Sequence, residues 1–358
     1  MTDRDSLELL ARLSLAAGPP GGEEPVRSVV RETLGGVGSL SHDRLGSLLC
    51  TLRGSADRPR IVLDSHLDEV GFMVQSVTEE GTLGLVPLGS WWGHVLLGQR
   101  VDVLCEAGAV PGVIGSKPPH FLSPEERERV IKPEALFVDV GASNRAEAEA
   151  TGVRVGDLVV PHAEFVELAV PGIVSGKALD NRVGVALMCQ TLVALAAREH
   201  PNTLIGVGAV QEELGARGAG TAAELARPDV ALVLECTPAD DLPGARVRQA
   251  ALGRGPQIRF FDPTALSNRR LVRFVESVAR EIDVPVQLAV RTSGGTDAQA
   301  LHRFREGVPT VVVGVPARYI HSHVALLRMD DYRAAARLVI EVVLRLDAER
   351  VADFTRFE

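Results

Sequence analysis

Carboxylates and histidines stand at the ends of several apolar segments of this sequence. They are His66 and Asp68 after residues 61–63, Glu212 and Glu213 after 204–210, Glu235 after 230–234, and His321 soon after 310–315. In an open α/β sheet, ligand sites lie beyond the carboxyl ends of the strands, so we expect these side chains to converge on one crevice. Because gathered carboxylates repel each other unless protons or cations intervene, the pattern predicts a cation site.

Another acidic residue, Asp180, lies at the start of a long apolar segment. Residues 175–184 read Ser-Gly-Lys-Ala-Leu-Asp-Asn-Arg-Val-Gly, and residues 183–197 are apolar nearly all round. This pattern is typical of a buried helix, for which Asp180 or Asn181 is well placed as the N-cap. Capping alone would explain an Asp or Asn there. In combination with the other acids and histidines, we expect Asp180 to bridge two metal ions.

The predicted donors are oxygen and imidazole without thiolate, a set that suits zinc, manganese or cobalt. The predicted ligands are His66, Asp180, Glu213, Glu235 and His321. Three carboxylates and a hydroxide balance two divalent ions and leave both histidines neutral. Two such ions about 3.5–4 Å apart make hydroxide available near neutral pH. Glu212, next to a predicted ligand, is placed to act as the general base. Each residue taken alone also has an ordinary explanation, since charged side chains are mostly exposed.

The elements that must position these residues follow an α/β pattern. Helices are predicted at about 5–17, 23–34, 183–197, 269–282 and 331–346, and buried strands at 61–63, 204–210, 230–234 and 310–315. Residues 70–168 instead contain short β-prone segments separated by glycine and proline, with a helix at 145–150 and a polar loop at 120–134. We therefore expect one α/β domain, residues 1–69 and 169–358, interrupted by a β-rich, barrel-like insertion, residues 70–168.

Composition limits the classes of partner. The net charge of −9 is spread over 358 residues without an extended basic run, which argues against nucleic acid and anionic membranes. No segment is long and apolar enough to span a membrane, and the acidic N-terminus lacks the apolar core of a signal peptide, so we expect a cytoplasmic protein. The four cysteines are scattered and indicate neither disulfides nor a thiolate metal site.

The motifs together resemble those of the M42 metallo-aminopeptidases, the tetrahedral peptidases whose relatives include glutamyl aminopeptidases and endoglucanase-labelled proteins. The resemblance covers nearly the whole chain. It rests on residues 64–71 (Asp-Ser-His-Leu-Asp-Glu-Val-Gly), 176–184, 211–219 (Gln-Glu-Glu-Leu-Gly-Ala-Arg-Gly-Ala), 293–298 (Ser-Gly-Gly-Thr-Asp-Ala) and 318–322 (Arg-Tyr-Ile-His-Ser). Within the insertion, residues 114–120 and 152–157 also match. Five motifs in the family's order make the match specific.

The resemblance implies a role for each site residue. His66 and Glu235 would bind one ion, Glu213 and His321 the other, and Asp180 would bridge them. Glu212 would be the general base and acid, and Asp68 the carboxylate that orients His66. Much of the family has Asp where this chain has Glu235, and the longer side chain could change metal preference or spacing.

The resemblance also implies an architecture and an assembly. The catalytic domain would be a mixed-sheet α/β/α metallopeptidase domain of the phosphorylase/hydrolase type. The insertion would be a PDZ-like dimerisation domain, and the assembly a dodecamer built from dimers, with its active sites facing an internal chamber.

We therefore expect a dinuclear metal-dependent aminopeptidase that removes N-terminal residues from short peptides, with zinc as the first expectation and cobalt or manganese as alternatives. The main alternative is a metal-dependent deacylase or amidohydrolase acting on small N-acylated compounds. An endoglucanase is disfavoured because glycosidases commonly use two carboxylates without metal and only 4% of residues are aromatic. A binding protein on an inactive peptidase scaffold is a third alternative. The preferred N-terminal residue stays open, because Arg291 could recognise an acidic side chain or form an ordinary ion pair.

Overall fold

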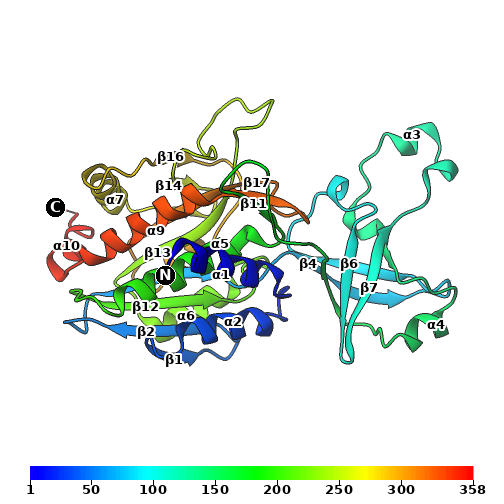
Figure 1. Ribbon diagram of the computed structural model, residues 1–358, viewed down its shortest axis with the longest axis horizontal. Coiled ribbons are helices and arrows are strands. Elements are labelled where there is room, and N and C mark those ends of the chain that lie inside the picture. The colour runs from blue at the N-terminus through cyan, green and yellow to red at the C-terminus, as the bar shows by residue number, and fades with distance from the viewer. Residues whose placement is uncertain (358) are drawn as a thin grey trace.

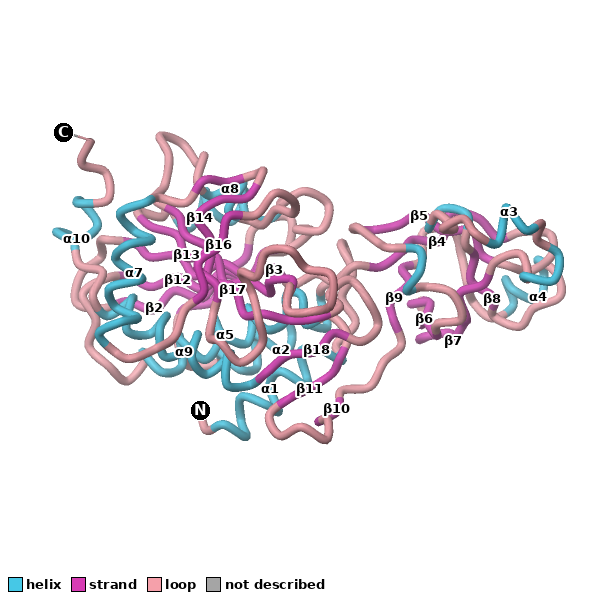
Figure 2. The backbone as a smooth tube through the Cα atoms, turned by 90° about the horizontal axis from the view of Figure 1, so that it is seen from above, coloured by secondary structure: helices cyan, strands magenta, loops and turns pink. Residues whose placement is uncertain are grey.

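The computed structural model describes residues 1–357 and shows two lobes of unequal size joined by a narrow connection (Figures 1 and 2). The larger lobe contains both chain termini and a mixed sheet of twelve strands. The smaller lobe is a closed antiparallel barrel of six strands. The predicted fold class, a mixed α/β domain with a separate β-barrel, is confirmed.

The large sheet has the strand order β1-β2-β12-β3-β13-β17-β18-β11-β10, and β14 also pairs with β17 and leads to β15 and β16. Its strands are β1 (Ser39–His42), β2 (Leu48–Arg53), β3 (Arg60–His66), β10 (Val166–Glu167), β11 (Ile173–Gly176), β12 (Thr203–Ala209), β13 (Val230–Pro238), β14 (Gln257–Asp262), β15 (Ala265–Leu266), β16 (Gln287–Val290), β17 (Thr310–Arg318) and β18 (Ala325–Arg328). The neighbours β12, β3, β13 and β17 are parallel, so their carboxyl ends lie at one edge.

Helices cover both faces of this sheet. They are α1 (Asp3–Leu15), α2 (Glu24–Leu34), α5 (Leu179–Leu195), α6 (Arg217–Ala226), α7 (Arg269–Glu281), α8 (Ala298–Leu301), α9 (Met329–Leu344) and α10 (Ala348–Asp353). One core joins α1, α2, α5, α7 and α9 to one face, and a smaller, alanine-rich core joins α6 and α8 to the other. The central strands are apolar on both faces because both are covered, as the continuous apolar segments of the sequence indicate.

The barrel has its own core and consists of β4 (Gly71–Val77), β5 (Leu83–Leu88), β6 (Arg100–Cys105), β7 (Gly108–Gly115), β8 (Phe137–Asp139) and β9 (Leu158–Pro161), with α4 (Arg145–Ala150) against β4. The polar segment 120–134 contains the short helix α3 (Pro124–Arg127). The barrel lobe also has three 3₁₀ turns, at Gly93–Val95, Pro119–Phe121 and Pro133–Ala135. The predicted insertion, residues 70–168, contains all six strands of the barrel. Its exact boundaries stay a prediction.

A buried ion cluster fastens the start of α5 to the end of β3. Lys177 Nζ lies 2.6 and 2.7 Å from the two carboxylate oxygens of Glu69, and Arg182 Nη2 lies 3.5 Å from Oε1. Arg182 is fully buried and also donates to the carbonyls of Leu13 in the last turn of α1 and of Ala16 and Gly18 just after it. The cluster therefore ties three distant segments together beside the stretch that carries Asp180.

Replacing Glu69 with Gln should lower the free energy of unfolding by about 3–5 kcal/mol, because two buried cations lose their counter-charge. Chemical denaturation of the full-length protein measures this change. The matched control is Glu8→Gln in the exposed Arg4–Glu8 pair, which should leave the denaturation midpoint unchanged. An equally small effect of Glu69→Gln would show that the cluster is not important for stability.

Candidate metal centre

All five predicted ligands line one cavity of about 530 Å³ at the carboxyl edge of the parallel strands. His66 is the last residue of β3, and Glu213 follows β12. Glu235 lies within β13, and His321 follows β17. Asp180 comes from the start of α5, which packs across β3 and β13. The topology of the sheet thus brings together residues that are up to 255 positions apart.

The two carboxylate oxygens of Asp180 face different histidines. Oδ1 lies 3.4 Å from His66 Nε2, and Oδ2 lies 3.3 Å from His321 Nε2. Glu235 Oε1 is 3.6 Å from His66 Nε2, and Glu213 Oε1 is 3.2 Å from His321 Nε2. The site therefore consists of two donor groups, each with one histidine and one glutamate, and Asp180 is shared between them.

The local backbone explains why Asp180 faces the cavity. Asp180 and Asn181 have non-helical dihedral angles, and Asn181 Oδ1 accepts a hydrogen bond from Gly184 N at 3.1 Å, so Asn181 caps the regular helix. Asn181 Nδ2 also donates to the carbonyl of Leu234 on β13 at 2.9 Å. A side chain on Gly184 would lie 2.3 Å from that carbonyl oxygen, so only glycine permits this approach. The capping role belongs to Asn181, and the Asp180 carboxylate turns toward the histidines.

Each histidine is oriented through its other ring nitrogen. His66 Nδ1 lies 3.1 Å from the backbone carbonyl of Asp68, and His321 Nδ1 lies 2.7 Å from the backbone carbonyl of Ser90 in the barrel lobe. Because a carbonyl only accepts, Nδ1 carries the proton in both rings, and Nε2 of the neutral ring is free to bind a cation.

Asp68 has a different main contact from the one we expected. Its carboxylate is 3.5 Å from His66 Nδ1, farther than its own carbonyl. Both carboxylate oxygens instead accept backbone hydrogen bonds at 3.0 Å, one from Glu212 N and one from Glu213 N. The side chain thus holds the segment that carries the proposed base and one proposed ligand.

The electrostatics of the site favour a cation. Burial raises the pKa of Glu213 and of Glu235. Burial alone would lower the pKa of His321, but the Asp180 and Glu213 carboxylates raise it to about 11. Within residues 1–357, neither Lys nor Arg forms an ion pair with the carboxylates of Asp180, Glu213 or Glu235. Oxygen and imidazole donors that are not paired with Lys or Arg are a suitable ligand set for zinc, cobalt or manganese.

Comparison with known proteins agrees with this geometry. The family model for M42 glutamyl aminopeptidases matches residues 46–338. The chain belongs to the M42 family. It is 34% identical to the glutamyl aminopeptidase of Lactococcus lactis subsp. cremoris over 361 residues, which cover 99% of each chain. This M42 chain is therefore an aminopeptidase-type peptide hydrolase.

Solved structures of the M42 family share the whole architecture. A TET aminopeptidase from the marine sediment archaeon Thaumarchaeota archaeon SCGC AB-539-E09 superposes with a TM-score of 0.95 at 43% identity, covering 98% of this chain and 100% of that one. The TET1 peptidase of Pyrococcus horikoshii, which can assemble into a tetrahedron or a large octahedral shell, gives a TM-score of 0.85 at 31% identity, covering 95% and 100%. These M42 structures show the same two-lobed fold.

Two polar residues at or near this cavity, Arg259 and Asp64, were not among the residues singled out from the sequence. Arg259 and Arg291 line the cavity and are paired with Asp262 at 3.0 Å and Asp240 at 2.9 Å. Asp64 is fully buried, and burial raises its pKa to about 7. The signal for Asp64 was its position, a charged residue directly after an apolar strand and two residues before His66. Arg259 carried no local signal, because its place in the cavity depends on how β14 pairs with β17. Arg291 was singled out from the sequence, and here it is paired with Asp240.

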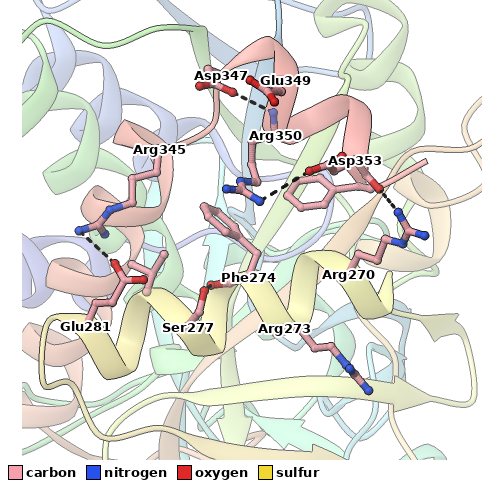
Figure 3. A pocket seen from close by; sticks show the side chains of 12 residues that line it. Arg270, Arg273, Phe274, Ser277, Glu281, Arg345, Asp347, Glu349, Arg350 and Asp353 are labelled. Carbon is pink, nitrogen blue, oxygen red and sulfur yellow. Dashed lines mark hydrogen bonds and ion pairs between the residues drawn. The ribbon is translucent and has the colours of Figure 1, made fainter. Parts of the chain in front are cut away.

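A larger cavity of about 810 Å³ lies between α7 and α10, away from the predicted ligands (Figure 3). Its charged groups largely pair with each other. Arg345 lies 3.9 Å from Glu281, and Arg350 lies 3.7 Å from Asp353 and packs over the ring of Phe274. No predicted site residue lines this cavity, whereas all five predicted ligands line the cavity at the carboxyl edge of the sheet.

Replacing Asp68 with Asn should lower kcat/KM for aminopeptidase substrates by about 10- to 100-fold, a typical cost for a group that supports ligands. The amide cannot accept from both backbone N–H groups, so residues 212 and 213 shift. Steady-state kinetics measure the effect. Asp331→Asn is the control, because Asp331 is equally buried and also accepts two backbone hydrogen bonds, from Gly253 and Gly255. Equal kinetic losses in both variants would contradict the assignment.

Proposed function

We propose that this chain is a dinuclear metal-dependent aminopeptidase that removes N-terminal residues from short peptides. The observation that carries the proposal is the shared carboxylate of Asp180, which presents one oxygen to each of two histidine–glutamate groups. A mononuclear site would not require two such groups on opposite sides of one carboxylate. The M42 relatives support the peptide as substrate.

In this proposal His66 and Glu235 hold one divalent ion, Glu213 and His321 hold a second, and Asp180 contacts both. Zinc is the first candidate, with cobalt or manganese as alternatives. When bound, the ions would supply Lewis acidity to the peptide carbonyl and to an attacking water. The extra methylene of Glu235 does not take it out of the site, because its Oε1 still faces His66 at 3.6 Å and accepts from Cys236 N.

Glu212 is the proposed general base. Its Oε2 lies 3.9 Å from His66 Nε2, and the side chain lines the cavity without taking the position of a donor in either group. Burial raises its pKa well above the usual carboxyl value, which makes the carboxylate a stronger base. Glu212 would accept the proton of the attacking water and return it to the departing amine.

The assembly is proposed to be a dodecamer formed through the barrel lobe. Support comes from the Pyrococcus horikoshii relative that assembles into closed shells. The barrel also exposes apolar side chains that a partner subunit could cover, among them Val86, Val113 and Val155. Nothing in the geometry of the cavity favours the deacylase alternative.

Replacing Glu212 with Gln should lower kcat by about 10²- to 10⁴-fold, the usual contribution of a general base. Metal content should stay at the wild-type level, because the proposed ligands are unchanged. Metal analysis by mass spectrometry and steady-state kinetics on the same preparation test both statements. Glu213→Gln is the matched comparison and should lose bound metal as well as activity. Near-normal turnover by Glu212→Gln would remove this residue from the mechanism.

Chelator-stripped protein should regain hydrolysis of aminoacyl p-nitroanilides when zinc, cobalt or manganese is added back, and the panel will identify the preferred residue. N-acetylated substrates should be resistant, because the carboxylate-rich cavity suits a free amino terminus. Rates on paired free and acetylated substrates give the comparison. Efficient cleavage of the acetylated member would contradict an aminopeptidase and revive the deacylase.

A further inference from the structure

The loop that carries His321 rests on the barrel lobe rather than on its own lobe alone. His321 Nδ1 donates to the carbonyl of Ser90 at 2.7 Å. Two residues later, the buried His323 donates from Nε2 to the carbonyl of Arg100, the first residue of β6, at 2.9 Å. Two backbone carbonyls of the inserted barrel therefore fix the two histidines of this loop.

The segment that supplies the first carbonyl is firmly held within the barrel. Trp91 Nε1 donates to the carbonyl of Gly71 at 2.9 Å, and the Trp91 ring stacks on Phe72 with 5.1 Å between centroids. The Trp91 ring also lies near the ring of His323, with 6.2 Å between centroids. Trp91 thus connects the barrel core directly to the loop of His321.

Glu213, the other ligand proposed beside His321, also packs against this segment. A side chain on Gly89 would lie 3.0 Å from Glu213 Oε2 and 3.2 Å from Glu213 Cβ. Gly89 has a φ of +89°, a conformation that glycine adopts without strain. The barrel segment 89–91 therefore contacts both residues of the Glu213–His321 group.

The other donor group has its supports within the large lobe. His66 is oriented by the backbone carbonyl of Asp68, just after β3, and Glu235 accepts from the neighbouring Cys236 N on β13. Neither contact involves the barrel. The two halves of the site are thus supported by different parts of the chain.

The loop also has a backbone that needs external support. Tyr319 and His321 both have positive φ, 60° and 55°, a left-handed conformation that is unfavourable for residues other than glycine. Such residues persist where surrounding contacts determine their conformation. The hydrogen bonds to Ser90 and Arg100 are among those contacts, together with the one from Ser322 Oγ to the Tyr319 carbonyl at 2.6 Å.

We propose that the inserted barrel is a structural part of one metal site: through Ser90, Trp91 and Arg100 it holds His321 in its binding orientation, with His323 as a positioning residue. This inference rests on the proposed two-metal function. It gives the insertion a second role, beyond assembly, in setting the affinity of the Glu213–His321 site alone.

The test is a titration of chelator-stripped, full-length protein with cobalt. Binding is measured by calorimetry and by the visible absorbance of the bound ion. Wild type should bind two equivalents. In His323→Leu, one equivalent should keep its wild-type dissociation constant, and the other should weaken by about 10- to 100-fold. His323→Gln, whose amide can donate to the Arg100 carbonyl, should restore most of the loss. Trp91→Leu should reproduce the selective weakening.

Two controls separate positioning from general loosening of the fold. His200 is as buried as His323, at 4% exposure, but lies at the far end of the sheet. The variant His200→Leu should therefore leave both dissociation constants unchanged. Trp92→Ala changes the exposed neighbour of Trp91 and should also have no effect. Unchanged binding in His323→Leu, or equal weakening of both sites, would overturn the inference alone. A wild type that binds fewer than two ions would overturn the proposed function as well.

Discussion

The crowding of carboxylates around Asp180 is the constraint on which the rest of the structure depends. The side chains of Asp180, Glu213 and Glu235 are brought together largely buried, and His66 and His321 lie between them. Such a group is stable when positive charge is present, and the divalent cations of a metallopeptidase provide that charge. The shared position of Asp180 divides the cluster into two halves, and that division makes a dinuclear centre the natural interpretation.

The fold around this cluster is arranged to hold it from several directions. The parallel strands β3, β12, β13 and β17 position four of the proposed ligands at one edge, and close packing at Gly184 brings α5 against β13. The buried Glu69–Lys177–Arg182 cluster holds the segment that contains Asp180 against the residues just after β3. The barrel completes the support from the opposite side at Ser90. Ligands that repel each other thus sit on elements that cannot easily move apart.

The sequence predicts the parts of this arrangement that depend on local pattern. The apolar segments at 204–210 and 310–315 are found as strands, and the helix at 145–150 has the predicted bounds. β5 shows no clear strand pattern in the sequence, because Gly84 and Pro87 interrupt its alternation. The end of β13 was placed too early, so Glu235 lies inside the strand rather than after it. Contacts such as that between His321 and Ser90 depend on how the two lobes meet, which no local pattern records.

The most direct test of the dinuclear centre is crystallographic. Crystals of the protein grown with zinc would be measured on both sides of the zinc absorption edge, and the anomalous difference map would be inspected around Asp180. We predict two peaks about 3.5–4 Å apart, one between His66 and Glu235 and the other between His321 and Glu213, with an Asp180 oxygen directed at each. A single peak, or peaks that do not contact Asp180, would contradict it.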